Sequence, residues 1–103
     1  MRITQARVTQ ILSGSYTGDA TVNKAIPHGL GVIPKAVLIA RKEGYYQYRI
    51  MNQQAAIWCW NATTNTYKAV TAMDAVNFYV GNSANYEESA NGNLSIYRWI
   101  AIG

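Results

Sequence analysis

Residues 23–41 read NKAIPHGLGVIPKAVLIAR, and this stretch holds both prolines and the only histidine of the chain. Pro27 and Pro34 cannot donate a hydrogen bond to a neighbouring strand, so they are expected to mark strand ends. Between them, Gly29 and Gly31 can take positive φ at no steric cost, which suits a tight turn. The stretch therefore predicts a strand, a rigid turn and a second strand.

The segment that follows this turn, residues 35–41, is apolar on both alternating faces and has a cation at each end. This pattern is typical of a central strand that is covered on both sides. Seven other segments are rich in alternating, β-branched or aromatic residues and are separated by polar turns. The eight predicted strands are residues 2–12, 20–26, 35–41, 45–51, 55–60, 66–71, 75–80 and 94–103. Short strands at this spacing, with no convincing helix, predict an all-β fold, an antiparallel β-sandwich of about six to eight strands.

Several turns between these strands can be assigned from glycine and small polar residues. Residues 13–19, SGSYTGD, have the composition of a turn in which Gly14 and Gly18 flank hydroxyl side chains. Residues 42–44 are predicted to close a hairpin, with Gly44 at the position that needs positive φ. The longest polar stretch, residues 81–93, is predicted to be a loop.

Period-two alternation assigns the side chains of each strand to its two faces. The groups expected to share a face are Trp58 with Trp60, Ile57 with Cys59, Val76 with Phe78 and Val80, Leu94 with Ile96, Ile100 and Ile102, and Tyr97 with Trp99 and Ala101. Both faces of the closing strand are thus apolar. We expect this strand to be central in its sheet or covered by a neighbouring subunit, because an exposed apolar edge strand would aggregate.

Length and composition favour one domain, residues 1–103, with much of its surface hidden against a partner. Half of the residues are hydrophobic but only 14% are charged, which is low for a soluble domain. The net charge of +4 comes from nine scattered cations and few acids, so a phosphate-tracking stripe is not indicated and nucleic-acid binding is not expected. No segment has the apolar length of a signal peptide or membrane span, so we expect a soluble protein first made in the cytosol.

The residues that could perform chemistry do not form a catalytic or metal-binding motif. His28 lacks an accompanying nucleophile motif, and an imidazole bonded to nearby backbone explains it better. Cys59 lies between two tryptophans and is expected to be a small core residue. Glu87 and Glu88 are consecutive, so on an extended segment they point to opposite sides and make a poor acid–base pair. We therefore predict a protein that is not an enzyme and that uses no metal or cofactor.

Aromatic side chains are more numerous than a core of this size can bury neatly. Outside the closing strand, the aromatic residues that make up this excess are Tyr45, Tyr46, Tyr48, Trp58, Trp60, Tyr67 and Tyr86. Tyrosine and tryptophan are typical of protein interfaces, and they also form platforms on which sugar rings stack. Tyr45, Tyr46, Trp60 and Tyr86 are the candidates for contact with a partner or ligand, whereas Tyr97 and Trp99 are assigned to packing.

Two motifs resemble a recurrent β-domain of bacteriophage virion proteins. Residues 14–19, GSYTGD, are similar to that domain's G-x-Y-x-G-[DN] turn, and residues 28–37, HGLGVIPKAV, are similar to its L-G-x-x-P-K-x-V element. The ending, residues 97–103, resembles the Y-x-W/I-x-A tail of the same domains and also the closing strand of H-type lectins. The similarity covers residues 14–41 and 94–103.

The resemblance implies a virion protein assembled in the host cytoplasm and acting without catalysis. Such domains occur in tail fibres, tail tips, head fibres and capsid decoration proteins, and H-type lectin domains assemble as trimers. The resemblance thus implies a homotrimer that contacts other virion proteins. The turn residues are expected to be structural, and Tyr97, Trp99, Ile100 and Ala101 of the closing strand are expected to serve packing or the subunit interface. The alternative is a lectin-like receptor-binding module for host surface glycan. Our expectation favours protein contacts, with no measurable binding of free glycans.

Overall fold

Eight strands and no helix make up the described part of the chain, which in this computed structural model is residues 10–61, 63 and 65–103. The strands are β1 (Ile11–Thr17), β2 (Lys24–Pro27), β3 (Ala36–Arg41), β4 (Gln47–Met51), β5 (Ala56–Trp60), β6 (Asn65–Ala69), β7 (Asn77–Val80) and β8 (Ile96–Ile102). The predicted strand at residues 2–12 lies outside the described residues except for its last three positions. The prediction of an all-β fold is confirmed for the described chain.

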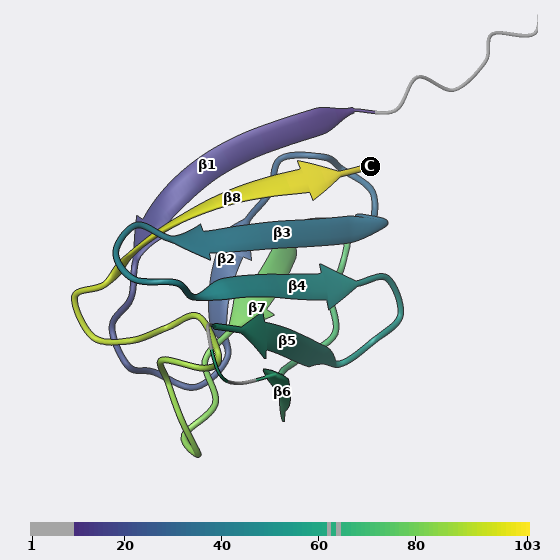
Figure 1. Cartoon of the computed structure of the whole chain (residues 1–103). Coiled ribbons are helices and arrows are strands. Elements are labelled where there is room, and N and C mark those ends of the chain that lie inside the picture. The colour runs from purple at the N-terminus through teal and green to yellow at the C-terminus, as the bar shows by residue number, and fades with distance from the viewer. Residues whose placement is uncertain (1–9, 62, 64) are drawn as a thin grey trace, which may run out of the picture.

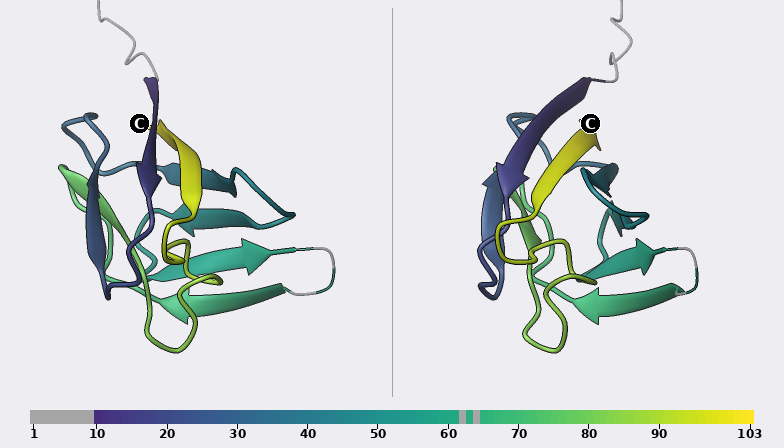
Figure 2. Two further views of the ribbon diagram at one scale, coloured as in Figure 1. Left: turned by 90° about the vertical axis from the view of Figure 1, so that its left-hand side faces the viewer. Right: turned by 60° about the vertical axis from the view of Figure 1, so that its left-hand side comes forward.

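Six of the strands form one antiparallel sheet in the order β1-β8-β3-β4-β5-β6, and β2 pairs with β7 in a second, two-stranded sheet. The small sheet lies behind the large one, so the arrangement is sandwich-like (Figures 1 and 2). The closing strand β8 runs between β1 and β3, and it is therefore central in its sheet as expected.

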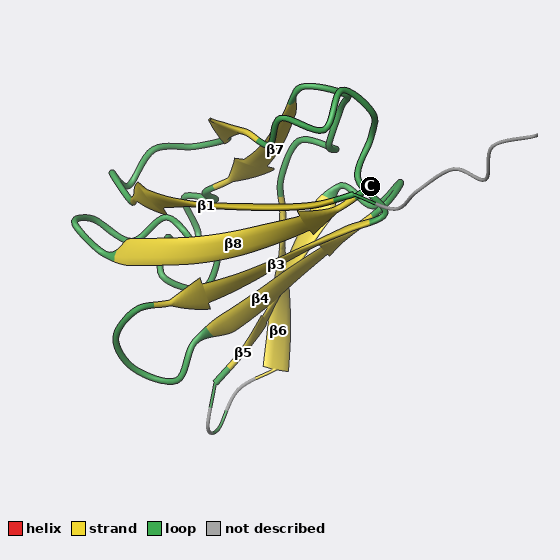
Figure 3. Ribbon diagram, turned by 90° about the horizontal axis from the view of Figure 1, so that it is seen from above, coloured by secondary structure: helices red, strands yellow, loops and turns green. Residues whose placement is uncertain are grey.

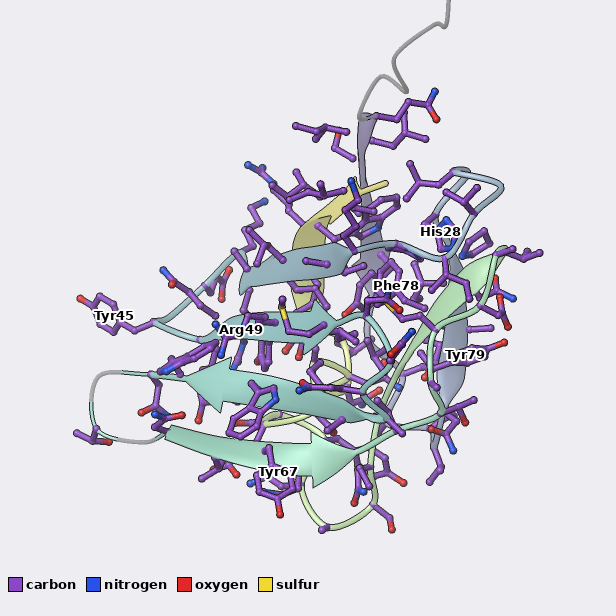
Figure 4. The ribbon with its side chains drawn as sticks, turned by 90° about the vertical axis from the view of Figure 1, so that its right-hand side faces the viewer. His28, Tyr45, Arg49, Tyr67, Phe78 and Tyr79 are labelled. Atoms are coloured by element: carbon purple, nitrogen blue, oxygen red, sulfur yellow. The ribbon has the colours of Figure 1, made fainter. Side chains whose placement is uncertain are left out.

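The hydrophobic core lies between the two sheets. Alternate residues of the large sheet point inward and are buried, and they meet Ile26, Phe78 and Val80 of the small sheet. The ring centroids of Phe78 and Trp99 are 5.3 Å apart with the rings nearly perpendicular, and Figure 4 shows Phe78 between the layers. The inward residues of the large sheet are Val37, Ile39, Tyr48, Ile50, Ile57, Cys59, Tyr97, Trp99 and Ala101.

Gly14 lies in the middle of β1, so its assignment to a turn was wrong. It pairs with Trp99 of β8, and a Cβ at this position would come within 2.5 Å of the indole Cζ2. The glycine is needed because the inward-facing ring of Trp99 occupies the space of a side chain. Gly18 follows β1 and pairs through its backbone with Leu94 and Ser95, where a Cβ would collide with the Gly92 carbonyl.

The turn between β2 and β3 has the predicted form. Pro27 is the last residue of β2, and Pro34 is buried two residues before β3 begins. Gly29 and Gly31 have φ of 79° and 73°, so both take the left-handed conformation that glycine adopts without strain. Gly44 in the β3–β4 hairpin likewise has a φ of 82°.

Among the described residues, no second layer of this chain covers the outward face of the large sheet, although the apolar pattern of β3 is typical of a strand covered on both sides. Leu38 of β3 is 40% exposed and Ile100 of β8 is 37% exposed. The sheet is strongly twisted, as Figure 3 shows from above, and the small sheet covers only its inner side. Val76 was also expected to share the buried face of Phe78, but it precedes β7 and is exposed.

Candidate functional site

Strand register aligns most of the outward side chains of the large sheet in three rows, and Ile96 and Thr17 form a further pair beyond the third row. The first row is Ile11, Ile102, Ala36 and Met51; the second is Ser13, Ile100, Leu38, Arg49, Trp58 and Tyr67; the third is Ser15, Arg98, Ala40, Gln47, Trp60 and Asn65. The first row is aliphatic, and the third is mainly polar, cationic and aromatic. The open face therefore changes in character from one end to the other.

A groove of about 790 Å³ lies over the parts of the second and third rows that β1, β8, β3 and β4 contribute, and it ends at Trp60 of β5. Its floor is aliphatic and includes Leu38, Ala40 and Ile100. The polar and aromatic side chains that line it are Ser13, Ser15, Gln47, Arg49, Trp60 and Arg98. An apolar floor with a few converging polar groups is the usual composition of a ligand site.

Arg49 and Trp60 form one wall of this groove. The guanidinium carbon of Arg49 lies 4.7 Å from the centroid of the Trp60 ring, within the range of a cation–π interaction. Its Nε is buried and has no hydrogen-bond partner among the described residues. Within the described chain neither Arg49 nor Arg98 forms a salt bridge, so no described acidic side chain neutralises either charge.

A second hollow of about 340 Å³ continues from the groove. The two share Ala40, Gln47 and Trp60, so Trp60 stands between them. Tyr45, Tyr46, Arg41 and Asn61 line the second hollow. Tyr45 is 80% exposed, and Figure 4 shows it on the same side of the large sheet as Arg49.

The structure brings together three of the four aromatic residues proposed for partner contact. Tyr45, Tyr46 and Trp60 meet at the second hollow, although Tyr46 also stacks on the buried Tyr48 at 6.2 Å. Tyr86 lies elsewhere, half-buried in the loop that precedes β8. Of the closing-strand residues, Tyr97, Trp99 and Ala101 are in the core, whereas Ile100 lies on the groove floor.

His28 is held in the β2–β3 turn by both ring nitrogens. Its Nε2 is 2.9 Å from the carbonyl oxygen of Asp74, and its Nδ1 accepts a hydrogen bond from the Leu30 backbone N–H at 3.1 Å. These contacts require a neutral ring with the proton on Nε2. The side chain is buried, and it joins the turn to the segment before β7.

Cys59 faces the core from β5. Burial is the main cause that raises the pKa of its thiol to about 11, and the charge of Glu88 adds to this effect. The thiolate is the nucleophilic form of cysteine, so this side chain is poorly suited to chemistry at neutral pH.

The acidic candidates are engaged in separate structural contacts. Glu88 accepts hydrogen bonds from Lys68 and Thr66, and the Lys68 contact is the main cause that lowers the pKa of its carboxyl. Glu87 instead lies 3.7 Å from Arg41. No cluster of three metal-ligating side chains occurs among residues 10–61, 63 and 65–103.

Sequence reasoning did not select Gln47, Arg49 or Arg98 as site residues. The alternation within β4 places Gln47 and Arg49 on one face, which was an available signal. Their meeting with Trp60 and Arg98 depends on the pairing of β4 with β5 and of β3 with β8, and strand order is not readable from local pattern.

No protein-family model, curated protein or solved structure matches this chain. In the described part of the chain there is no helix of the length and hydrophobicity needed to cross a membrane.

Proposed function

We propose that this chain is a non-enzymatic structural protein of a bacteriophage virion. It would decorate or cement the capsid, or complete a tail or fibre tip, as a homotrimer that acts through protein–protein contacts. The observation that carries this proposal is the outward face of the six-stranded sheet, which no described segment of the chain covers and which exposes aliphatic side chains. The virion assignment and the trimer rest in addition on the resemblance of the turn and closing-strand motifs.

The exposed aliphatic side chains at both ends of the open face form the proposed assembly surface. Ile11 is 62% exposed, and Ile102 lies beside it in the β1–β8 pair. Ile96, at the other end of β8, is also exposed. An apolar surface of this kind on a chain with 14% charged residues is typical of a protein contact.

Changing exposed isoleucines to aspartate tests this surface. Sedimentation equilibrium of the unaltered protein should give about three times the 11.4 kDa chain mass. The double variant Ile11→Asp, Ile96→Asp should sediment as a monomer with an unchanged circular dichroism spectrum, because both side chains point to solvent within the protomer. Val22→Asp is the control, since Val22 is exposed but lies outside the large sheet. A monomeric parent protein would disprove the trimer.

The place of the protein in a virion can be examined directly. Immunogold labelling or density mapping of phage particles should locate it at the head surface or at the tail tip. Absence from purified particles would refute the virion assignment.

The groove supports a second candidate function, a lectin-like module that binds glycan on the host surface. The supporting observation is the combination of Trp60 with the polar side chains of Gln47, Arg98 and Ser15 over an aliphatic floor. Purified protein titrated against host cells and cell-wall polysaccharide should then bind saturably, and Trp60→Ala should weaken that binding. Tyr86→Ala is a suitable control because Tyr86 lies outside the groove.

A further inference from the structure

We infer that the groove on the outward face is a site for an acidic glycan, an oligosaccharide chain that bears carboxylates. Arg49 and Arg98 would bind the carboxylates, and Trp60 would contact the apolar face of a sugar ring. This inference rests on the lectin-like candidate function and names its ligand class.

The charge of the groove favours an anion. None of the described residues that line the groove or the adjoining hollow is acidic. Arg98 is exposed, and Arg49 has a buried Nε without a partner in the described chain. A guanidinium presents paired N–H donors that match the two oxygens of a carboxylate. No described acidic side chain pairs with either guanidinium, so their N–H groups can bond a carboxylate in the groove.

The position of the groove on a sheet face favours a glycan over a peptide. Extended peptides usually bind by adding a strand at a sheet edge, where backbone groups are free. Here the floor belongs to β8, β3 and β4, whose backbone groups are paired with neighbouring strands. The groove therefore offers mainly side-chain donors and acceptors, which suit hydroxyl and carboxylate groups. The amide of Gln47 and the hydroxyls of Ser13 and Ser15 are such groups.

The length of the site favours a chain of several sugars. The groove and the second hollow share Gln47 and Trp60, so a ligand can pass from one to the other. Their volumes of about 790 and 340 Å³ exceed what a single sugar ring would fill. Tyr45 stands at the far hollow as a second exposed aromatic surface.

Among the described residues, the groove and the second hollow have too few cationic side chains without an acidic partner to bind a nucleic acid. Arg41 lines the second hollow but lies 3.7 Å from Glu87, which neutralises it in part. Arg49 and Arg98 remain, whereas a nucleic-acid site contacts many successive phosphates. Two guanidiniums can bind a ligand that carries a few carboxylates.

The test titrates the whole protein with three probes and measures binding by tryptophan fluorescence and by calorimetry. The probes are a galacturonate oligosaccharide, the same oligosaccharide with its carboxyls reduced to alcohols, and a glycerol-phosphate polymer. We expect the galacturonate chain to bind at least about tenfold more tightly than the reduced chain, because each charge-assisted hydrogen bond is worth a comparable factor. The advantage should shrink as salt is raised.

Variants assign the effect to the groove. Arg98→Gln should remove most of the preference for the acidic oligosaccharide, and Trp60→Leu should weaken the binding of both the acidic and the reduced oligosaccharide. Lys35→Gln is the charge-matched control and Tyr67→Leu the aromatic control, since both side chains are outside the two hollows. Circular dichroism checks that each variant is folded.

The outcomes separate this inference from the proposed functions. Equal binding of the acidic and reduced chains would refute the carboxylate assignment but keep a lectin-like function. Tighter binding of the glycerol-phosphate polymer would refute it in favour of phosphate. If no probe binds, both the acidic-glycan inference and the lectin-like function are refuted. Loss of subunit association in Arg98→Gln would also refute both, because the groove would then be a protein interface. The assembly surface is tested independently by the Ile11→Asp, Ile96→Asp variant.

Discussion

Replacing Gly14 by alanine should destabilise the protein through a specific collision with Trp99. The added Cβ would lie 2.5 Å from Cζ2, 2.8 Å from Cε2 and 3.0 Å from Nε1 of the indole. Carbon atoms in favourable contact are about 3.5–4.0 Å apart, so the ring would have to move by about 1 Å. Phe78 lies against the same ring, with 5.3 Å between centroids, and limits that movement.

The expected loss of stability follows from two opposing effects. Overpacking of this kind typically costs about 1–3 kcal/mol. Alanine in place of glycine recovers about 0.5–1 kcal/mol by restricting the unfolded chain. We therefore expect a net loss of up to about 2.5 kcal/mol, centred on about 1 kcal/mol, and each kcal/mol should lower Tm by about 4–8 °C in a domain of this size.

A double-mutant cycle with Trp99→Phe makes the test specific. Phenylalanine lacks the indole atoms that the new Cβ would meet, and Nε1 of Trp99 has no hydrogen-bond partner in the described chain to be lost. In the Trp99→Phe background, Gly14→Ala should therefore be neutral or stabilising, with a coupling energy of at least about 1 kcal/mol.

Urea unfolding at a fixed protomer concentration measures all four proteins, since association would make stability depend on concentration. Ser15→Ala, on the same strand but facing outward, is the control. The same cost of Gly14→Ala in both backgrounds would refute the collision as its cause.

Three further predictions concern the core, the acid limit and the closing strand. The Cys59 thiol, with its pKa raised to about 11, should resist iodoacetamide at pH 8 until the protein is unfolded; rapid labelling of folded protein would contradict its burial. The pKa of Asp19 is lowered from 3.8 to about 2, chiefly by its hydrogen bond from Thr21, so its stabilising contribution is present above pH 3.8 and is lost as pH falls towards 2; Asp19→Asn should flatten that part of a stability–pH curve measured by urea unfolding. Deleting residues 100–103 removes three of the seven residues of the central strand β8 and should abolish soluble protein, which expression and gel filtration would show; a folded, associated truncation product would count against this role of β8.

Local patterns in the sequence predict much of this fold. Alternation and turn residues identify most strands within a few positions, and Pro27, Gly29, Gly31 and Gly44 have the expected roles. These features depend on interactions between near neighbours in the chain, so a sequence contains them directly.

Features set by distant pairing could not be predicted. The composition of residues 13–17 is typical of a turn, yet the segment is a strand because β8 pairs with it along its whole length. The sequences of β3 and β8 are apolar on both alternating faces. They do not show that the face of Leu38 and Ile100 is the one that no described segment covers. The groove needs the register of β3, β4, β5 and β8 together, and no single segment encodes it.

The place of β8 between β1 and β3 also determines when the protein can fold. Gly14 pairs with Trp99, so the first and last described strands must meet across almost the whole chain. Such non-local pairing makes folding slow, since a long loop must close before any contact forms. During synthesis β1 has no partner until Ile96–Ile102 leaves the ribosome, and β3 can pair only with β4. Unpaired strand edges at this stage are prone to join other chains, so the rate of late synthesis should affect the yield of folded protein.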